Sequence, residues 1–284
     1  MLYNNKEELL KILTNNRLYT EKKFGQNFLI NPQIIEKIIS AAEINSNDYV
    51  IEVGPGLGIM TMELARLCKK VDTIEIDAKL FPFLGETFKN QANIRLIHQD
   101  VLKTIPPEET YKVIANIPYY ITSPIIRHYL SPQKNSLRPT SLTLLVQLEV
   151  AEKICALPGD HSVLSLLTQV LGKPEIIAKV PAHNFFPAPK VDSAILKINT
   201  LDQPQVKNIP LFTEIIKKAF SQKRKTILNS LKNIKEIPRI DLEKILIKST
   251  ISPLERPEKL DFQKWNLLVS NLETHPNSQD PNFS

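Results

Sequence analysis

The sequence predicts an α/β protein with a doubly wound, mostly parallel sheet, followed by a small all-helical C-terminal domain. From residue 49 onward, short apolar runs typical of strands alternate with helical patterns, and such alternation is typical of βαβ units. A glycine-rich turn follows the first of these runs and precedes a helical stretch at 59–69. The expected strands are "YVIEV" (49–53), "VDTIEI" (71–76), "IRLI" (94–97), "KVIAN" (112–116) and "SLTLLVQ" (141–147).

Two later apolar runs, 175–180 and 193–198, are separated by a proline-containing segment instead of a helix. We therefore expect an antiparallel pair at the edge of the sheet, joined by a long and functional loop. A polar, proline-containing stretch at 199–210 then leads into helical patterns, and we place the domain boundary near residue 202. The expected helices are 211–221, 224–232, 241–248 and 261–272.

The remaining parts of the chain and its composition narrow the class of protein. The N-terminal segment, 1–30, lacks the features of a signal peptide and is expected to be helical, and the polar end, 273–284, is expected to be disordered. No segment approaches the roughly 20 apolar residues of a membrane span. The two cysteines, Cys68 and Cys155, form no motif typical of disulfides, zinc or thiol catalysis. We expect a cytoplasmic monomer without a metal.

The glycine turn "EVGPGLG" (52–58) closes the first expected strand. Gly54 and Gly56 allow the backbone to turn sharply and to approach a ligand closely. A dinucleotide fingerprint would place its third glycine at position 59, which is Ile59, so the turn argues against a nicotinamide cofactor. Its position is the one at which doubly wound sheets bind adenosine-type ligands, although a tight connection without a ligand remains the alternative.

One acidic residue ends the second expected strand, and another follows the third. Glu75 comes about 20 residues after the glycine turn, where a carboxylate accepts hydrogen bonds from ribose hydroxyls. Its alternative role is a helix N-cap, for which the neighbouring Asp77 is better placed. Asp100 follows the third strand and could accept a hydrogen bond from an adenine amine, with an N-cap as an equal alternative.

The motif "NIPYYITSP" (116–124) follows the fourth expected strand, at the same sheet edge. The Asn116 side-chain oxygen and the Ile117 carbonyl form a pair of acceptors that can hold both hydrogens of an aromatic amine and turn its lone pair toward an electrophile. Pro118 fixes the chain between them, and Tyr119 offers a flat face to the ring. A strand-terminating turn is the alternative, and Tyr120 is expected to be a packing residue.

Together these motifs resemble the small-subunit ribosomal RNA adenine dimethyltransferases, from about residue 20 to residue 265. The segments that carry the resemblance are "KKFGQNFL" (22–29), "EVGPGLG" (52–58), "IEID" (74–77), "QDVL" (99–102), "NIPYYITSP" (116–124), "FFPAPKVDSAI" (185–195) and "SQKRKTILNSLK" (221–232). One departure is visible at His161 and Ser162, where relatives usually carry a Tyr-Gly pair. His161 is interpreted as a loop residue, and the change puts the conformation of that loop in doubt.

The resemblance implies a class I S-adenosylmethionine-dependent methyltransferase with a Rossmann-like catalytic domain at 1–202 and an RNA-binding domain at 203–272. Its substrate would be two adjacent adenines in the 3′-terminal hairpin loop of 16S ribosomal RNA, in the immature small subunit, with two methyl groups added to each N6. The implied cofactor residues are Asn27, Leu29, Gly54, Gly56, Glu75, Asp100 and Asn116, and the implied catalytic residues are Asn116, Ile117, Pro118, Tyr119 and Phe185.

Two assignments depend on the resemblance more than on the residues themselves. Phe185 is favoured as a core residue by its type, whereas the resemblance makes it a second stacking face opposite Tyr119. The clustered basic residues favour a solvated face when taken alone, whereas the resemblance makes them contacts to RNA phosphates. They are Lys22, Lys23, Lys223, Arg224 and Lys225.

Two further functions remain open from the sequence. The first is a related enzyme that acts on large-subunit RNA, which the forms of "FFPAPKVDSA" and "SQKRKTILNSLK" disfavour. The second is an RNA-binding assembly or transcription factor that kept the fold and lost catalysis. The intact Asn116, Tyr119, Glu75 and Asp100 argue against that alternative.

Overall fold

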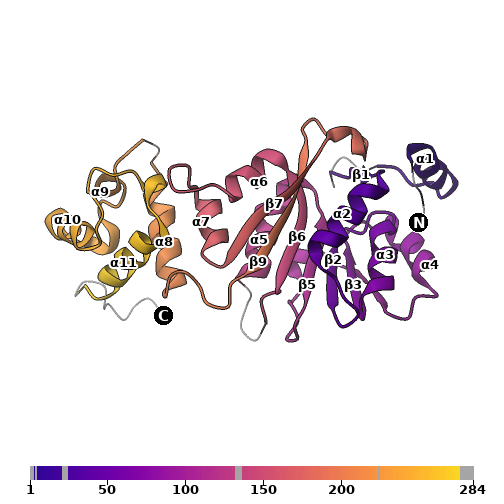
Figure 1. Cartoon of the computed structure of the whole chain (residues 1–284), viewed down its shortest axis with the longest axis horizontal. Coiled ribbons are helices and arrows are strands. Elements are labelled where there is room, and N and C mark those ends of the chain that lie inside the picture. The colour runs from indigo at the N-terminus through magenta and orange to yellow at the C-terminus, as the bar shows by residue number, and fades with distance from the viewer. Residues whose placement is uncertain (1–2, 4, 21–24, 132–135, 223, 276–284) are drawn as a thin grey trace. The chain divides into compact units, whose positions relative to one another are not determined.

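A computed structural model of the chain describes residues 3, 5–20, 25–131, 136–222 and 224–275 (Figure 1). The chain forms two compact units. The first combines Met1–Glu152 with Lys173–Thr200, and the second combines Lys153–Gly172 with Leu201–Ser284.

The first unit is built on a sheet of seven strands in the order β4-β3-β2-β5-β6-β9-β7. Their bounds are β2 (Tyr49–Val53), β3 (Lys70–Glu75), β4 (Ile94–His98), β5 (Lys112–Asn116), β6 (Ser141–Gln147), β7 (Gly172–Val180) and β9 (Ser193–Thr200). The pairs β2–β3, β3–β4, β2–β5 and β5–β6 are parallel, and β6–β9 is antiparallel. The doubly wound, mostly parallel sheet is confirmed, and β7 and β9 lie at its edge as expected.

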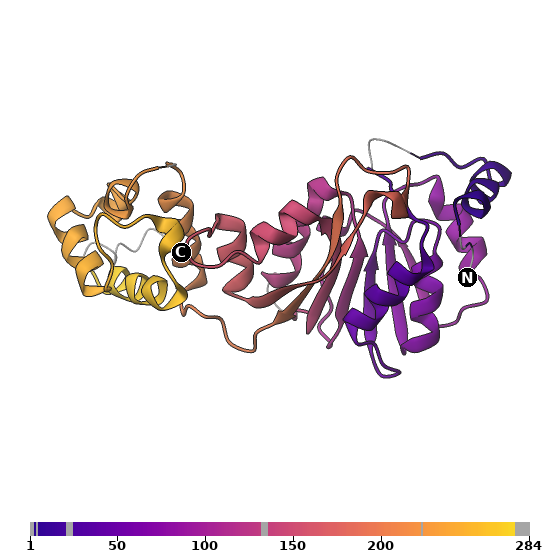
Figure 2. The ribbon, with the colours of Figure 1, turned by 45° about the horizontal axis from the view of Figure 1, so that its top comes forward.

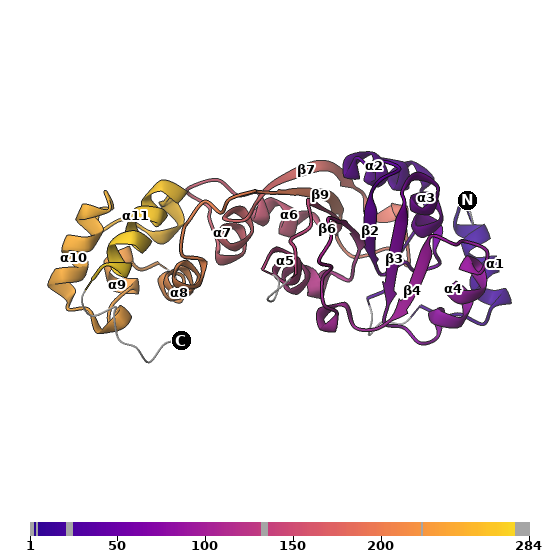
Figure 3. The ribbon, with the colours of Figure 1, turned by 90° about the horizontal axis from the view of Figure 1, so that it is seen from below.

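Helices cover both faces of this sheet, which is why its central strands are buried and mostly apolar. They are α2 (Pro32–Ala42), α3 (Ile59–Leu67), α4 (Leu80–Phe88), α5 (Thr122–Leu130) and α6 (Leu148–Ile154). The crossover from β2 to β3 and the crossover from β5 to β6 run in opposite directions along the sheet. Because both are expected to be right-handed, α3 and α5 lie on opposite faces, as Figure 3 shows.

Helix α2 shows how local sequence sets an element of this layer. The side chain of Asn31 accepts a hydrogen bond from the backbone of Gln33, and Pro32 occupies the first turn, where it removes no helical hydrogen bond. The buried residues Ile34, Ile35, Ile38 and Ala42 recur at helical spacing. This apolar stripe packs the helix into the core of the first unit.

The N-terminal segment is only partly helical. Helix α1 (Lys6–Asn15) forms and is capped by the Asn5 side chain. The expectation of helical structure throughout 1–30 is wrong, because Phe28–Leu29 forms strand β1 and pairs antiparallel with β8 (Phe185–Phe186). Strand β8 lies in the long connection between β7 and β9, which turns back beside β1 (Figure 2).

The second unit is helical. Its elements are α7 (Val163–Gln169), α8 (Ile209–Ala219), α9 (Ile227–Ser230), α10 (Arg239–Lys248) and α11 (Phe262–Glu273), with short 3₁₀ turns at Ile234–Glu236 and Pro257–Lys259. Its core contains Phe212 and Trp265, whose ring centroids lie 6.0 Å apart in an edge-to-face arrangement. The helical character agrees with the sequence pattern.

Residues 153–172 group with these C-terminal helices, although the sequence pattern places them before the boundary near residue 202. The backbone N–H of Gly159 donates to the Glu258 carbonyl at 2.8 Å, and that of Leu201 donates to the Leu171 carbonyl at 2.9 Å. His161 is buried, and its Nδ1 lies 3.2 Å from the Leu260 carbonyl oxygen, so it belongs to the packing of this unit.

A buried carboxylate on β2 links this strand to α3 and to β3. Glu52 on β2 is fully buried, and its Oε2 accepts hydrogen bonds from the hydroxyls of Thr61 at 2.5 Å and Thr73 at 2.9 Å. Its Oε1 has no partner among the described residues. Burial raises the pKa of Glu52 to about 7, against the opposing effect of the two hydroxyl donors.

Glu52→Gln is expected to flatten the dependence of stability on pH. Because the folded-state pKa lies above the unfolded value, Glu52 contributes stability at low pH that is lost as pH rises through about 7. The wild type should lose roughly 1 kcal/mol of unfolding free energy from this group between pH 6 and pH 8, and the variant should lose none of it. Urea unfolding of both proteins at several pH values measures the difference, and parallel curves would contradict the assignment.

Candidate active site

A cavity of about 260 Å³ lies in the first unit, at the carboxyl ends of β2, β3 and β5. The residues that line it are 25–29, 53–57, 74–76, 99–102 and 116–121, together with Tyr3, Ile35, Ile59, Met60 and Leu80. Strands β2, β3 and β5 run parallel in register, so the segments that follow them emerge at one edge of the sheet. The expectation that the glycine turn, the acidic strand ends and the Asn116 motif meet at one place is confirmed.

The glycine turn forms a narrow part of the wall. Gly54 has a φ of 71°, its N–H donates to the Ile74 carbonyl at 3.0 Å, and a Cβ there would lie 3.5 Å from the Asn116 carbonyl oxygen. Gly56 has a φ of 58°, and a Cβ there would lie 3.2 Å from the Phe28 ring. Side chains at these two positions would be strained and would narrow the cavity.

Glu75 presents one carboxylate oxygen to the cavity. Its Oε1 accepts hydrogen bonds from the backbone N–H groups of Ile76 and Asp77, each at 2.8 Å. Its Oε2 has no hydrogen bond to a described residue, although the side chain is mostly buried. Burial raises the pKa of Glu75 to about 7, while the two N–H donors act in the opposite direction. A ligand with hydroxyl donors would satisfy the remaining oxygen.

Asp100 fills one of the two roles that the sequence left open, that of an N-cap. Its Oδ1 accepts a hydrogen bond from the backbone of Leu102 at 3.0 Å and so caps the 3₁₀ turn at Val101–Lys103. The residue lines the cavity. The second oxygen, Oδ2, receives no hydrogen bond from a described residue.

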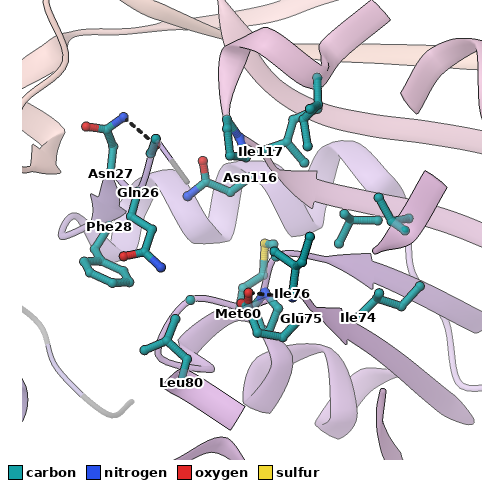
Figure 4. A pocket seen from close by; sticks show the side chains of 18 of the residues that line it. Gln26, Asn27, Phe28, Met60, Ile74, Glu75, Ile76, Leu80, Asn116 and Ile117 are labelled. Carbon is teal, nitrogen blue, oxygen red and sulfur yellow. Dashed lines mark hydrogen bonds between the residues drawn. The ribbon is translucent and has the colours of Figure 1, made fainter. Parts of the chain in front are cut away.

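Asn116 ends β5 with its amide pointing into the cavity (Figure 4). Neither this amide nor the neighbouring carbonyl oxygen of Ile117 has a hydrogen-bond partner among the described residues. The Ile117 side chain is buried, which anchors the backbone at this point. Pro118 has a φ of −55° and its carbonyl accepts from Ile121 at 3.1 Å, so the chain turns at once into the 3₁₀ turn Tyr119–Ile121.

The Tyr119 ring lines the cavity beside this acceptor pair. Its hydroxyl lies 2.8 Å from the Ser193 hydroxyl of β9, and either group can be the donor. Burial raises the pKa of Tyr119, so the phenol is neutral at physiological pH.

Residues 25–29 form the opposite wall. Gln26 donates to Asp77 Oδ2 at 2.7 Å, which ties this segment to the end of β3. The Asn27 amide donates to the Gly25 carbonyl at 3.0 Å, and Leu29 lies in β1. Figure 4 shows Gln26, Asn27 and Phe28 on the side of the cavity that the Asn116 amide faces.

Phe185 is not among the residues that line the cavity. Its side chain is only 3% exposed and packs in the core of the first unit, where strand β8 pairs it with Leu29. Phe186 is more exposed, with the Lys6 ammonium 5.1 Å from its ring centroid. In this arrangement Phe185 offers no free face to a base, so its stacking role stays a prediction.

Three of the five basic residues implied in RNA binding, Lys22, Lys23 and Lys223, lie outside the described residues. Arg224 and Lys225 are exposed in the second unit, and neither has an acidic partner within the described part of the chain. The expectation that they open a helix is wrong, because Arg224 has a φ of 71° and α9 begins only at Ile227.

Among the residues of the wall that sequence reasoning missed are Tyr3, Phe28 and Tyr120. Tyr3 is buried, lines the cavity and donates from its hydroxyl to the Leu29 carbonyl at 3.0 Å. Phe28 packs over Gly56. Tyr120, interpreted as a packing residue, is 65% exposed and lines the cavity, so that interpretation is wrong. The segment "GQNFL" already pointed to Phe28, whereas no pattern in the sequence pointed to Tyr3.

Known proteins resemble this chain over most of its length. A family model described as "Ribosomal RNA adenine dimethylase" matches residues 17–272. A ribosomal RNA small subunit methyltransferase A from Dehalococcoides mccartyi is 39% identical over 267 residues, which cover 91% of this chain and 90% of that protein. The protein of the same name from Caldanaerobacter subterraneus is 40% identical, covering 89% of this chain and 97% of that protein.

Two solved structures are similar as well. A dimethyladenosine transferase from Plasmodium falciparum matches with a TM-score of 0.75 and 29% identity, covering 87% of this chain and 97% of that one. The 23S rRNA methyltransferase ErmE matches with a TM-score of 0.69 and 30% identity, covering 87% of this chain and 100% of that one. The expected class I methyltransferase fold is thereby confirmed.

Tyr3→Phe is expected to destabilise the protein. The substitution keeps the ring in the wall of the cavity and removes the donor to the Leu29 carbonyl, at a cost of about 1 kcal/mol of unfolding free energy. Tyr19→Phe is the matched control, because Tyr19 is 72% exposed and its hydroxyl has no partner among the described residues. Chemical unfolding of the two variants checks the prediction, and equal stabilities would contradict it.

Proposed function

Because the chain belongs to the ribosomal RNA adenine dimethylase family, we propose that it dimethylates N6 of two adjacent adenines in the 3′-terminal hairpin loop of 16S ribosomal RNA. The chain is a methyltransferase. The observation that carries the proposed chemistry is the pair of unsatisfied acceptors, the Asn116 side-chain oxygen and the Ile117 carbonyl, beside the cavity and the Tyr119 ring. We further propose that the substrate is the immature small subunit and that the enzyme acts as a cytoplasmic monomer. In the described residues no helix is long and apolar enough to cross a membrane.

The cavity fits S-adenosylmethionine as the cofactor. Gly54 and Gly56 leave the space that side chains would fill, and Glu75 has a mostly buried carboxylate with an oxygen lacking a partner among the described residues. Glu75 would accept from the ribose hydroxyls and Asp100 from the adenine amine, with Asn27, Leu29 and Asn116 near the methionine end. When bound, the cofactor would supply a methyl group from its sulfonium sulfur. The sulfur would keep the electron pair of the broken S–CH₃ bond, and the methylated nitrogen would lose one proton to water.

The chain itself orients the target amine. Both hydrogens of an adenine N6 amine point to acceptors when the Asn116 oxygen and the Ile117 carbonyl receive them, so the nitrogen lone pair turns toward the cofactor side. Pro118 restricts the backbone between these two acceptors. Tyr119 stacks on the base, and Phe185 would provide the second face only if the β1–β8 pair shifted. In this proposal the residues promote methyl transfer by holding the target amine in line with the methyl group.

RNA binding is assigned to the basic residues, with the helical second unit as the RNA-binding domain. Arg224 and Lys225 lie in an exposed loop, where their charges can contact phosphates without breaking an ion pair within the described part of the chain. Lys22, Lys23 and Lys223 belong to the same proposal. The contribution of these basic residues to RNA affinity should decrease as the salt concentration rises.

Similarity to ErmE keeps methylation of 23S ribosomal RNA as a second candidate. The deciding experiment offers the protein and labelled cofactor to small subunits that lack the dimethyladenines, and separately to large-subunit RNA. Mass spectrometry of the RNA fragments should find two dimethylated adenines in the 16S 3′ fragment. Modification confined to the large-subunit RNA would overturn the proposed substrate, and binding without methyl incorporation would favour an assembly factor.

Asn116→Ala is expected to lower the rate of methyl transfer at least about a hundredfold, because the amine loses one of its two acceptors. The cofactor dissociation constant should change only a few-fold, since Glu75 and the glycine turn remain. Single-turnover transfer and calorimetric cofactor binding separate the two effects. A large loss of cofactor affinity would instead assign Asn116 mainly to cofactor binding.

Cofactor binding is expected to weaken as pH falls below 7. Donors from the ribose favour ionised Glu75, whose pKa of about 7 in the free protein leaves it mostly protonated at pH 6. Affinity should fall about tenfold between pH 8 and pH 6 from this group. Titration calorimetry of the wild type and Glu75→Gln tests this, because a pH dependence that persists in the variant belongs to other groups.

A further inference from the structure

We propose that Ser193 is a positioning residue that fixes the direction of the Tyr119 ring, and that this restraint matters more for the second methyl transfer to each adenine than for the first. The inference rests on the proposed function, since it assigns a role to a residue outside the acceptor pair. Its starting point is the 2.8 Å hydrogen bond between the Tyr119 and Ser193 hydroxyls, which joins the two residues 74 positions apart in the sequence.

The backbone around Ser193 is held in place by strand pairing and by hydrogen bonds. It is fully buried as the first residue of β9 and pairs with Gln147 of β6. The preceding residue, Asp192, accepts from the Leu148 N–H at 3.0 Å through its carbonyl and from the Ala182 N–H at 2.9 Å through its side chain. The strand pairing and the hydrogen bonds of Asp192 thus hold the backbone of Ser193, so its hydroxyl has a well-defined position.

Tyr119, in contrast, sits in a short 3₁₀ turn of three residues and is only half-buried. Its backbone is held by hydrogen bonds from Thr122 to its carbonyl, but these leave the two side-chain torsions free. Because the phenol oxygen lies on the axis of the second torsion, a bond at the tip of the ring mainly restrains the first torsion, which sets the direction of the ring. In the described part of the chain the Ser193 hydroxyl makes this one hydrogen bond.

The two methyl transfers differ in what holds the base. An unmodified amine carries two hydrogens, which the Asn116 oxygen and the Ile117 carbonyl can both receive. After the first transfer one hydrogen remains, so only one of these bonds can form. The stacking face of Tyr119 then contributes a larger share of the alignment, and a loosely held ring should impair the second transfer more than the first.

The test is single-turnover methylation of small subunits that lack the dimethyladenines, with mono- and dimethyladenine counted in the 16S 3′ fragment by mass spectrometry. Ser193→Ala should slow the second transfer about tenfold and let monomethyladenine accumulate, while the cofactor dissociation constant stays within about twofold of wild type. Ser141→Ala is the matched control, because Ser141 is another buried serine of the same sheet without a side-chain partner among the described residues.

Tyr119→Phe separates positioning from general destabilisation, because it keeps the ring and removes the other half of the bond. Ser193→Ala, Tyr119→Phe and the double variant should show the same ratio of mono- to dimethyladenine, since each removes one bond. A wild-type ratio in Ser193→Ala, or effects that multiply in the double variant, would overturn the inference while the proposed function stood. A wild-type protein that methylates no adenine would overturn both.

Discussion

The parallel register of β2, β3 and β5 is the constraint on which the site depends. Val53 pairs with Ile74 on one side and with Ala115 on the other, so the strand ends are level. The chain leaves β2 through Gly54, which has a positive φ. Because glycine has no side chain, the space in front of the strand ends stays open. Glu75 and Asn116 then face a common cavity from β3 and β5, the two strands that flank β2.

This constraint explains why so much of the site could be predicted. A parallel sheet covered on both faces reads as uninterrupted apolar runs, and the polar residue that ends each run is therefore visible in the sequence. Glu75, Asp100 and Asn116 were found in this way, and all three line the cavity. The spacing of the glycines in 52–58 likewise identified the turn that follows β2.

The opposite wall has no periodicity, so its residues Asn27 and Leu29 were expected only from the family resemblance. Strands β1 and β8 are two residues each and come from distant parts of the chain, so neither produces an alternating pattern. Residue type also does not predict whether a side chain faces the cavity or the core. Tyr120 and Phe185 are both aromatic residues in functional motifs, yet the first is exposed at the cavity and the second is buried in the core.

The helical unit was recognised from its pattern, but its division from the sheet unit is less simple than one boundary. Residues 153–172 belong to it, while 173–200 return to the sheet as β7 and β9. The polypeptide therefore passes between the units three times, at 152–153, 172–173 and 200–201. Recombination at a single point in the gene could not exchange the helical unit for that of another protein. Inheritance of the two units is thereby linked, and the helical unit is more readily altered by substitution of its surface residues than by replacement as a module.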